Sequence, residues 1–247
     1  MARTLLVRGL IAGVLAGVLA FAFAKLLGEP QIDKAIAFEE TLAAAAGDPG
    51  EPEVVSRGVQ STVGLLTGTV VMGVALGAIY AIVFAWAYGR VGALGARATA
   101  ALLALGAFLA ITVVPSTKYP ANPPTVGSPD TIDRRTLLFV AMIAISVLAL
   151  IAAWRLWRQL APRLGAWNGA IVAGLVFVAV IAVAELILPT VRETPSGFPA
   201  DVLWQFRIAS IGLNATLWAA LGLGFGVLAE RVLEPAASRR ATAPARA

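Results

Sequence analysis

Long apolar runs alternate with shorter polar segments along the chain, and these runs determine the predicted structure. Each run holds about the ~20 residues that an α-helix needs to cross ~30 Å of hydrocarbon. The runs lie at residues 5–27, 63–88, 98–114, 137–154, 167–188 and 208–229. The part of the first run from Leu10 to Leu27 follows Arg3 and Arg8 but is too long for the apolar part of a signal peptide, so we expect a retained helix. The pattern predicts an all-α, polytopic integral membrane bundle of about six transmembrane helices.

The composition favours a membrane protein over a soluble one. Hydrophobic residues make up 59% of the 247 residues and charged residues 13%, and the mean hydropathy is +0.85. A water-soluble chain of this length could not bury so much apolar surface. The net charge of +5 comes from basic residues spread along the chain rather than gathered in a stripe. We therefore expect contact with the lipid bilayer and no nucleic-acid partner.

The charged residues predict the orientation of the helices. Eleven arginines fall on one side of the predicted bundle, opposed only by Glu230 and Glu234. The other side carries eleven acids and eight basic residues, nearly all of them in three longer, proline-rich loops. Because cytoplasmic loops are enriched in Lys and Arg, both termini are expected in the cytoplasm. We expect one transmembrane domain over residues 1–234 and a disordered cytoplasmic tail over residues 235–247.

Glycines spaced by four residues occur in several of the runs. They are Gly9, Gly13 and Gly17; Gly64 and Gly68; Gly73 and Gly77; and Gly222 and Gly226. This spacing lets helix backbones approach closely in lipid. We therefore expect these glycines to pack helices together.

The outer loops and helix ends carry the polar candidates. The first outer loop contains a predicted helix at 31–46, which ends at a Gly-Asp-Pro-Gly turn and includes Glu39 and Glu40. Its carboxylates either attract divalent cations to the membrane or form an ordinary solvated surface. Glu185 is the one acid inside an apolar run, where ionisable groups are functional candidates, although it also lies close enough to the end to reach headgroups or a basic side chain. Asn214 is either a further oxygen ligand or a partner in a helix–helix hydrogen bond.

The stretch at residues 115–124 contains four prolines, which stiffen the backbone and remove N–H donors. It holds Lys118, Tyr119 and Asn122 on an outer loop. This loop is either a binding or gating element or a well-defined connection between helices.

The sequence has no histidine and no cysteine, which excludes imidazole and thiolate ligands or nucleophiles. It also has no nucleotide-binding P-loop and no catalytic triad motif. We therefore predict that the protein is not an enzyme. An enzyme acting on a lipid-linked substrate is a weaker alternative.

Four segments covering nearly the whole chain in order resemble a known family. They are residues 28–39 (GEPQIDKAIAFE), 54–60 (VVSRGVQ), 118–127 (KYPANPPTVG) and 198–207 (FPADVLWQFR). The third and fourth are the most specific. On these motifs the sequence resembles the CbtA family of probable cobalt transporters.

The resemblance implies a multi-pass subunit of the bacterial inner membrane that imports cobalt and is linked to cobalamin biosynthesis. It also implies a partner, a small single-helix membrane protein that bears histidines and is CbtB-like. Co²⁺ is then the transported substrate, and no permanently bound cofactor is expected. Because Co²⁺ favours imidazole, the partner would supply nitrogen ligands or the ion would pass partly hydrated.

On this hypothesis the chain contributes an entrance and oxygen ligands. The entrance residues are Lys118, Tyr119, Asn122, Asp201, Trp204 and Arg207. The metal-ligating candidates are Glu185 and Asn214 in the membrane, and Glu39 and Glu40 outside it. The alternative is a non-transporting membrane scaffold whose outer loops dock another membrane protein.

Overall fold

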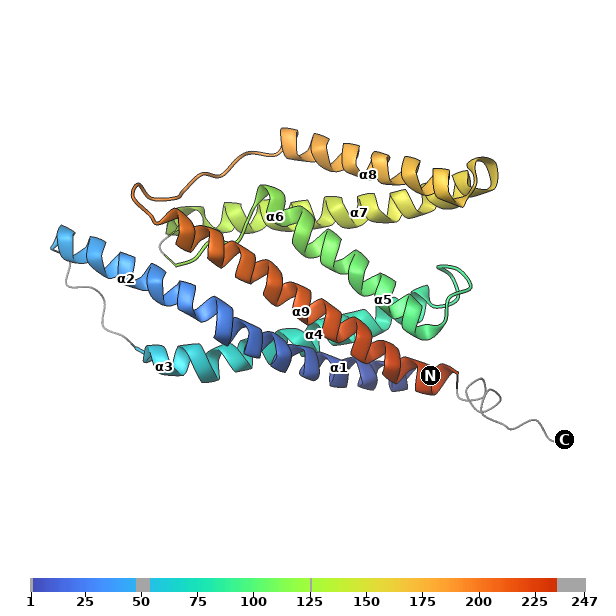
Figure 1. Ribbon diagram of the computed structural model, residues 1–247, viewed down its shortest axis with the longest axis horizontal. Coiled ribbons are helices and arrows are strands. Elements are labelled where there is room, and N and C mark those ends of the chain that lie inside the picture. The colour runs from blue at the N-terminus through green and yellow to red at the C-terminus, as the bar shows by residue number, and fades with distance from the viewer. Residues whose placement is uncertain (1, 48–53, 125, 235–247) are drawn as a thin grey trace. The chain divides into compact units, whose positions relative to one another are not determined.

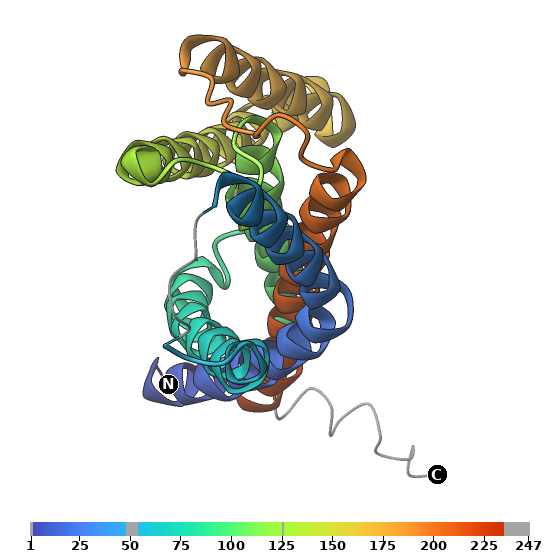
Figure 2. The same cartoon turned by 90° about the vertical axis from the view of Figure 1, so that its left-hand side faces the viewer.

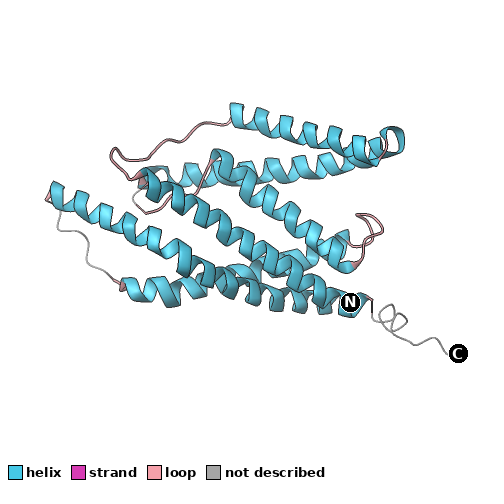
Figure 3. Cartoon of the chain, in the orientation of Figure 1, coloured by secondary structure: helices cyan, strands magenta, loops and turns pink. Residues whose placement is uncertain are grey.

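The computed structural model describes residues 2–47, 54–124 and 126–234, and over these ranges it contains helices and loops but no β-strand (Figure 3). The tail expected at 235–247 and residues 48–50 of the predicted turn lie outside the described residues. Six helical segments are long and apolar enough to cross a membrane: Ala2–Ala46, Arg57–Ala87, Ala96–Lys118, Pro129–Leu164, Ala166–Ile187 and Ala200–Leu233. The prediction of an all-α membrane protein with six spans is confirmed.

The helical elements follow one another with few interruptions (Figure 1). They are α1 (Ala2–Phe23), η1 (Ala24–Gly28), α2 (Glu29–Ala46), α3 (Arg57–Val59), η2 (Gln60–Gly64), α4 (Leu65–Ala87), α5 (Ala96–Ala107), η3 (Phe108–Val113), α6 (Val114–Lys118), η4 (Pro129–Thr131), α7 (Ile132–Leu164), α8 (Ala166–Ile187) and α9 (Ala200–Leu233). The segments η1, η2 and η3 are π-helical, and η4 is a 3₁₀ turn. Several helices therefore extend well past their apolar runs.

Two of the π-helical segments lie directly before a proline in the chain. One residue separates η1 from Pro30, and one separates η3 from Pro115. A proline offers no N–H to the carbonyl four residues earlier, and its ring crowds that carbonyl. A wider π turn relieves this conflict, so the third span continues to Lys118 instead of ending before the proline as its apolar run predicted. In η3 the carbonyl of Ala110 accepts a hydrogen bond from the buried hydroxyl of Ser146 on α7.

The chain divides into two compact units. Unit 1 draws its described residues from Met1–Glu29, Glu51–Leu105 and Gly212–Ala247. Unit 2 draws them from Pro30–Gly50 and Gly106–Ile211. The single transmembrane domain expected over residues 1–234 stays a prediction.

In unit 1, α1 and α4 lie side by side in close contact (Figures 1 and 2). The facing positions are Gly9 with Gly77, Gly13 with Gly73, and Gly17 with Thr69. A Cβ atom added at any of these glycines would strike backbone atoms of the other helix. The predicted packing role is confirmed for these residues but not for Gly64 and Gly68. A Cβ added at Gly68 would meet no atom within 4 Å, and one added at Gly64 would meet only the Val59 carbonyl of the preceding turn, at 3.6 Å.

A second small-residue contact in unit 1 joins α9 to α5. A Cβ added at Gly222 would strike the Cβ of Ala104, and one added at Gly226 would lie 3.3 Å from the Cβ of Ala100. Rings pack beside this contact, with the centroid of Phe225 4.9 Å from that of Phe84. The predicted role of Gly222 and Gly226 is therefore confirmed as well.

In unit 2, α7 and α8 form a hairpin whose turn is a single glycine (Figure 1). Gly165 has a φ of +81° and a ψ of 156°, a backbone conformation that is essentially open to glycine alone, and α7 ends there. Met142 on α7 and Ile181 on α8 belong to the buried apolar cluster of this unit, together with Val114 from α6. This cluster supports the polar residues described next.

Candidate functional site

The ends of α6 and α8 meet in a polar cluster of unit 2, which we call the α6–α8 cluster. It consists of Thr117, Lys118, Tyr119, Glu185, Pro189 and Thr190. The Lys118 ammonium donates hydrogen bonds to the backbone carbonyl of Glu185 at 2.6 Å and to the Thr190 hydroxyl at 3.2 Å. The Tyr119 hydroxyl donates to the carbonyl of Pro189 at 2.7 Å. Two predicted entrance residues and the predicted membrane ligand Glu185 therefore lie together.

The Glu185 carboxylate is the group of the α6–α8 cluster that can still accept a ligand. It is half-buried and accepts a hydrogen bond from the Thr117 hydroxyl. Among the described residues no basic side chain pairs with this carboxylate, because Lys118 binds the backbone carbonyl of the same residue instead. A carboxylate with one hydroxyl donor and no ion-pair partner retains lone pairs that a cation could use.

A second pair of predicted entrance residues meets at the start of α9. The Arg207 guanidinium donates to the Asn122 side-chain oxygen at 3.0 Å and to the Ala121 carbonyl at 3.4 Å. These bonds tie the proline-rich loop to α9, because the loop's prolines leave its carbonyls free to accept. Asp201 is exposed in the first turn of α9, and Trp204 is 62% exposed. Neither of these two side chains forms a hydrogen bond with Asn122 or Arg207.

An apolar contact in unit 2 joins three of the family-like segments. Ala35 and Phe38 on α2 pack with Val126 of the proline-rich loop and with Phe198 and Val202 at the start of α9. The rings of Phe38 and Phe198 meet edge to face, with centroids 5.1 Å apart and an angle of 74°. The segments at 28–39, 118–127 and 198–207 are thus close in space although they are far apart in sequence.

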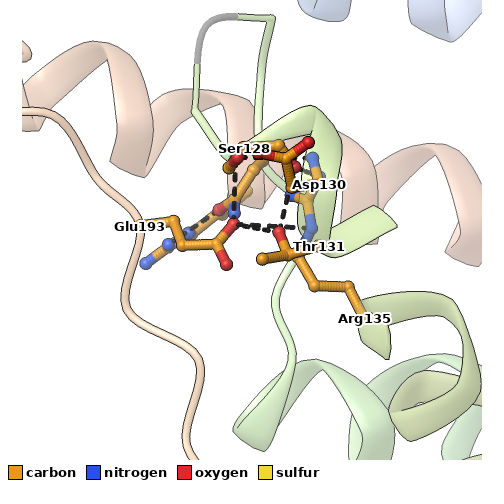
Figure 4. A network of polar contacts seen from close by, with 7 residues as sticks. Ser128, Asp130, Thr131, Arg135 and Glu193 are labelled. Atoms are coloured by element: carbon orange, nitrogen blue, oxygen red, sulfur yellow. Dashed lines mark hydrogen bonds and ion pairs between the residues drawn. The ribbon is translucent and has the colours of Figure 1, made fainter. Parts of the chain in front are cut away.

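The loop between α8 and α9 is fastened to the start of α7 by Glu193 (Figure 4). The Glu193 carboxylate accepts hydrogen bonds from the Thr131 hydroxyl at 2.9 Å and from the Ser128 backbone N–H at 3.0 Å. The Arg135 Nε lies 3.6 Å from the same oxygen. The carboxylate thereby caps the N-terminal end of the η4–α7 helix, where negative charge is favourable. We call this contact the Glu193 latch.

The pKa of Glu193 gives the latch a defined pH dependence. Hydrogen bonds from Thr131 and Ser128, together with the charges of Arg135 and Arg134, lower the pKa of Glu193 below its usual 4.5. The folded state therefore prefers the ionised form, so the stabilisation is complete above pH 4.5 and is lost as the pH falls through the lowered pKa. We expect the Glu193→Gln variant to be less stable than the wild type at pH 7 and equally stable in strong acid.

Thermal unfolding in detergent across this pH range checks the prediction. Glu39→Gln is the matched control, because Glu39 is an exposed carboxylate on α2 of the same unit. A constant difference between Glu193→Gln and the wild type at all pH values would contradict the role of the ionised carboxylate.

The other predicted metal ligands lie on α2 and α9. Glu39 and Glu40 are exposed on α2 in unit 2, and the half-buried Asn214 lies on the part of α9 that belongs to unit 1. Within residues 2–47, 54–124 and 126–234, no group of three or more Asp, Glu, His or Cys residues could hold a metal ion. This part of the chain therefore provides isolated oxygen donors rather than a complete metal site.

A charged cluster in unit 1, beside η1 and η2, was not predicted from the sequence. Arg57 forms an ion pair with the carboxylate of Glu29, whose side chain is 7% exposed. One turn earlier in the chain, the Lys25 ammonium donates to the hydroxyl of the buried Ser61 at 3.0 Å. Lys25 is a basic residue inside the first apolar run, and that position was the available signal. The paired residues are 28 and 36 positions apart in sequence. No local sequence pattern therefore indicates which residues pair.

The two acids on the arginine-rich side are both paired within unit 1. Glu230 forms an ion pair with Arg97. The Glu234 carboxylate accepts hydrogen bonds from the Ala96 backbone N–H at 2.8 Å and from the Tyr88 hydroxyl at 3.0 Å, which caps the start of α5. These acids fasten α9 to α5.

Comparison with known proteins identifies the family. The family described as probable cobalt transporter subunit (CbtA) matches residues 2–230, nearly the whole chain. No curated protein and no solved structure matches the chain. The four motifs, the six membrane spans and this match agree. The chain is a member of the CbtA family of probable cobalt transporter subunits.

Proposed function

We propose that this protein is the membrane-spanning subunit of a cobalt importer in a bacterial inner membrane, linked to cobalamin biosynthesis. Family membership over residues 2–230 supports the assignment to cobalt transport. The excess of arginine on one side of the six spans supports an orientation with both termini in the cytoplasm. The α6–α8 cluster and the Asn122–Arg207 contact then lie at the outer face, where the ion enters.

The environment of the Glu185 carboxylate is the main structural support for a role in transport. It lies at the end of a membrane span, accepts a hydrogen bond from Thr117 and has no ion-pair partner among the described residues. Even a half-buried carboxylate without a cation is costly in a membrane. A passing divalent cation would offset that cost, with Glu185 as an oxygen ligand and Asn214, Glu39 and Glu40 as further donors along the route.

A partner protein completes the proposed metal pathway. The sequence has no histidine or cysteine, and the described carboxylates form no group able to hold a metal. Co²⁺ binds imidazole more readily than isolated carboxylates. We therefore assign the nitrogen ligands to a small single-helix membrane protein bearing histidines, which is CbtB-like, while this chain supplies the oxygen donors and the entrance.

Cobalt accumulation in an importer-deficient bacterium tests this function. The strain expresses the chain with or without the histidine-bearing partner, and cobalt is measured by mass spectrometry. Uptake that requires both proteins is the expected result. The absence of uptake with both proteins present in the membrane would favour the scaffold, whose outer loops dock another membrane protein.

The role of Glu185 has its own test in the same assay. Glu185→Gln keeps an oxygen that can accept the Thr117 hydrogen bond but removes the negative charge. We expect cobalt uptake to fall about tenfold or more, as for loss of groups that tune a metal site. Arg192→Gln, an exposed change in the following loop, is expected to leave uptake unchanged. Unchanged uptake in Glu185→Gln would remove Glu185 from the pathway.

A further inference from the structure

A basic hollow lies on α7, at the end where the apolar run gives way to arginine and tryptophan. Its volume is about 380 Å³, and it is lined by Trp154, Arg155, Arg158 and Gln159. At 100° per residue these four positions share one face of the helix. The lining offers two guanidinium groups, an indole and an amide, so its polar surface consists mainly of hydrogen-bond donors.

The geometry of the hollow is partly fixed by its own residues. The Arg158 guanidinium lies over the Trp154 ring, 5.2 Å from the ring centroid, which is a cation–π contact. The Trp154 Nε1 is buried and has no hydrogen-bond partner among the described residues. A guanidinium that an aromatic ring holds in place presents preoriented donors to an anion.

The charged residues of α7 and α8 near the hollow are all basic. The sequence contains no acidic residue between Asp133 and Glu185, a stretch that includes all of the α7–α8 turn. Arg163 adds a third positive charge to the same end of α7. The local potential is therefore positive, and it selects for a negatively charged ligand.

The position of the hollow along α7 matches the level of the lipid headgroups. With a rise of 1.5 Å per residue, Arg155 and Arg158 lie about 3 and 8 Å beyond Ala153, the last residue before the arginines. The headgroup layer on one side of a bilayer is roughly 5–8 Å thick. Both guanidinium groups can thus reach the phosphate of a lipid whose acyl chains lie along the apolar part of α7. Trp157, whose indole donates to the Ala166 carbonyl at 3.0 Å, holds the adjoining turn in place.

We propose that Trp154, Arg155, Arg158 and Gln159 form a binding site for the phosphate headgroup of an anionic phospholipid. Arg155 and Arg158 bind the phosphate oxygens, Trp154 orients Arg158, and Gln159 donates at the rim. The site is independent of the α6–α8 cluster and of the identity of the transported ion. A purely topological role for the arginines would make Arg155, Arg158 and Arg163 interchangeable, whereas a binding site distinguishes the first two from the third.

Native mass spectrometry of the purified full chain tests the site. The protein is released from nanodiscs that contain phosphatidylglycerol and phosphatidylcholine in equal amounts, and the retained lipids are counted. We expect the wild type to retain phosphatidylglycerol preferentially. The Arg155→Gln/Arg158→Gln double variant is expected to bind it about 30-fold more weakly. Arg163→Gln, which removes a charge from the same helix end but not from the hollow, is expected to keep the preference.

Three results would overturn the proposal. The first is equal retention of the two lipids by the wild type, and the second is equal loss in Arg163→Gln and in the double variant. The third is displacement of the bound lipid by millimolar inorganic phosphate, which would assign the hollow to a soluble phosphate. Because Arg155 and Arg158 are exposed, the double variant should fold, and its circular dichroism spectrum verifies this. None of these readouts depends on cobalt uptake.

Discussion

Replacing Gly13 with alanine is expected to destabilise the protein, whereas the same replacement at Gly68 is expected to stabilise it. Alanine is a better helix former than glycine by about 0.8–1 kcal/mol, and this gain applies at both positions. At Gly68 nothing lies within 4 Å of the new methyl group. At Gly13 the methyl group would strike the backbone carbonyl of Gly73 on α4, which cannot move aside as a side chain could. The helices must therefore separate.

The cost of that separation is expected to exceed the gain in helix propensity. Overpacking in a tight contact destabilises proteins by about 1–3 kcal/mol, and separating α1 from α4 also weakens the neighbouring contacts at Gly9 and Gly17. Thermal unfolding in detergent, with Gly68→Ala as the matched control, checks the sign of both effects. Equal shifts of the unfolding temperature in the two variants would show that α1 and α4 are not in this close contact.

Replacing Arg57 with methionine is expected to be strongly destabilising, because it leaves the Glu29 carboxylate buried without its cation. The Glu29 side chain is 7% exposed and that of Arg57 is 27% exposed. Breaking a buried ion pair by removing one partner costs about 3–5 kcal/mol. We expect a loss at the lower end of this range, since partial exposure of Arg57 lets water compensate in part.

A double-mutant cycle separates this burial effect from the loss of the pair itself. Adding Glu29→Gln to Arg57→Met removes the stranded charge, so the double variant is expected to regain most of the lost stability. Unfolding by SDS in mixed micelles, followed by tryptophan fluorescence, gives the free energies of unfolding. Arg192→Met, at an exposed loop position, serves as the control. If the double variant were as unstable as Arg57→Met alone, the effect would not come from a buried charge.

The sequence predicted the membrane spans because bilayer thickness sets a length that apolar runs must match. It did not predict where the helices end. The runs stop at charged residues or prolines, but a helix continues through them when its backbone hydrogen bonds can be maintained. The π-helical segments before Pro30 and Pro115 maintain them here. Spacing by four predicted the roles of Gly13 and Gly73, but not that Gly68 would lack a neighbour, because spacing does not specify a partner.

The individual residues of the candidate site were predicted from the sequence, but the contacts between them were not. Lys118, Tyr119 and Glu185 were singled out separately, and their meeting at the ends of α6 and α8 depends on packing between distant segments. The pairs Glu29–Arg57 and Glu193–Arg135 were not expected. An ionic contact between distant residues produces no repeating pattern in the sequence, so the partners cannot be matched. A single charged residue in an apolar run can be recognised, because an unpaired charge is costly in lipid.

Unit 1 is built from the first and the last spans, and this has a consequence for membrane insertion during synthesis. Arg8 on α1 donates to the carbonyl of Leu228 on α9, and Gly212 on α9 packs against the Phe23 ring. When the last residue of α1 has been translated, more than 180 further residues must follow before these partners exist. Until then, Arg8 on α1 and the face of α5 that carries Ala100 and Ala104 must remain in the bilayer without their partners on α9. A ribosome that stalls after α8 would leave an assembly that lacks its closing helix, which membrane quality-control proteases could recognise by those faces.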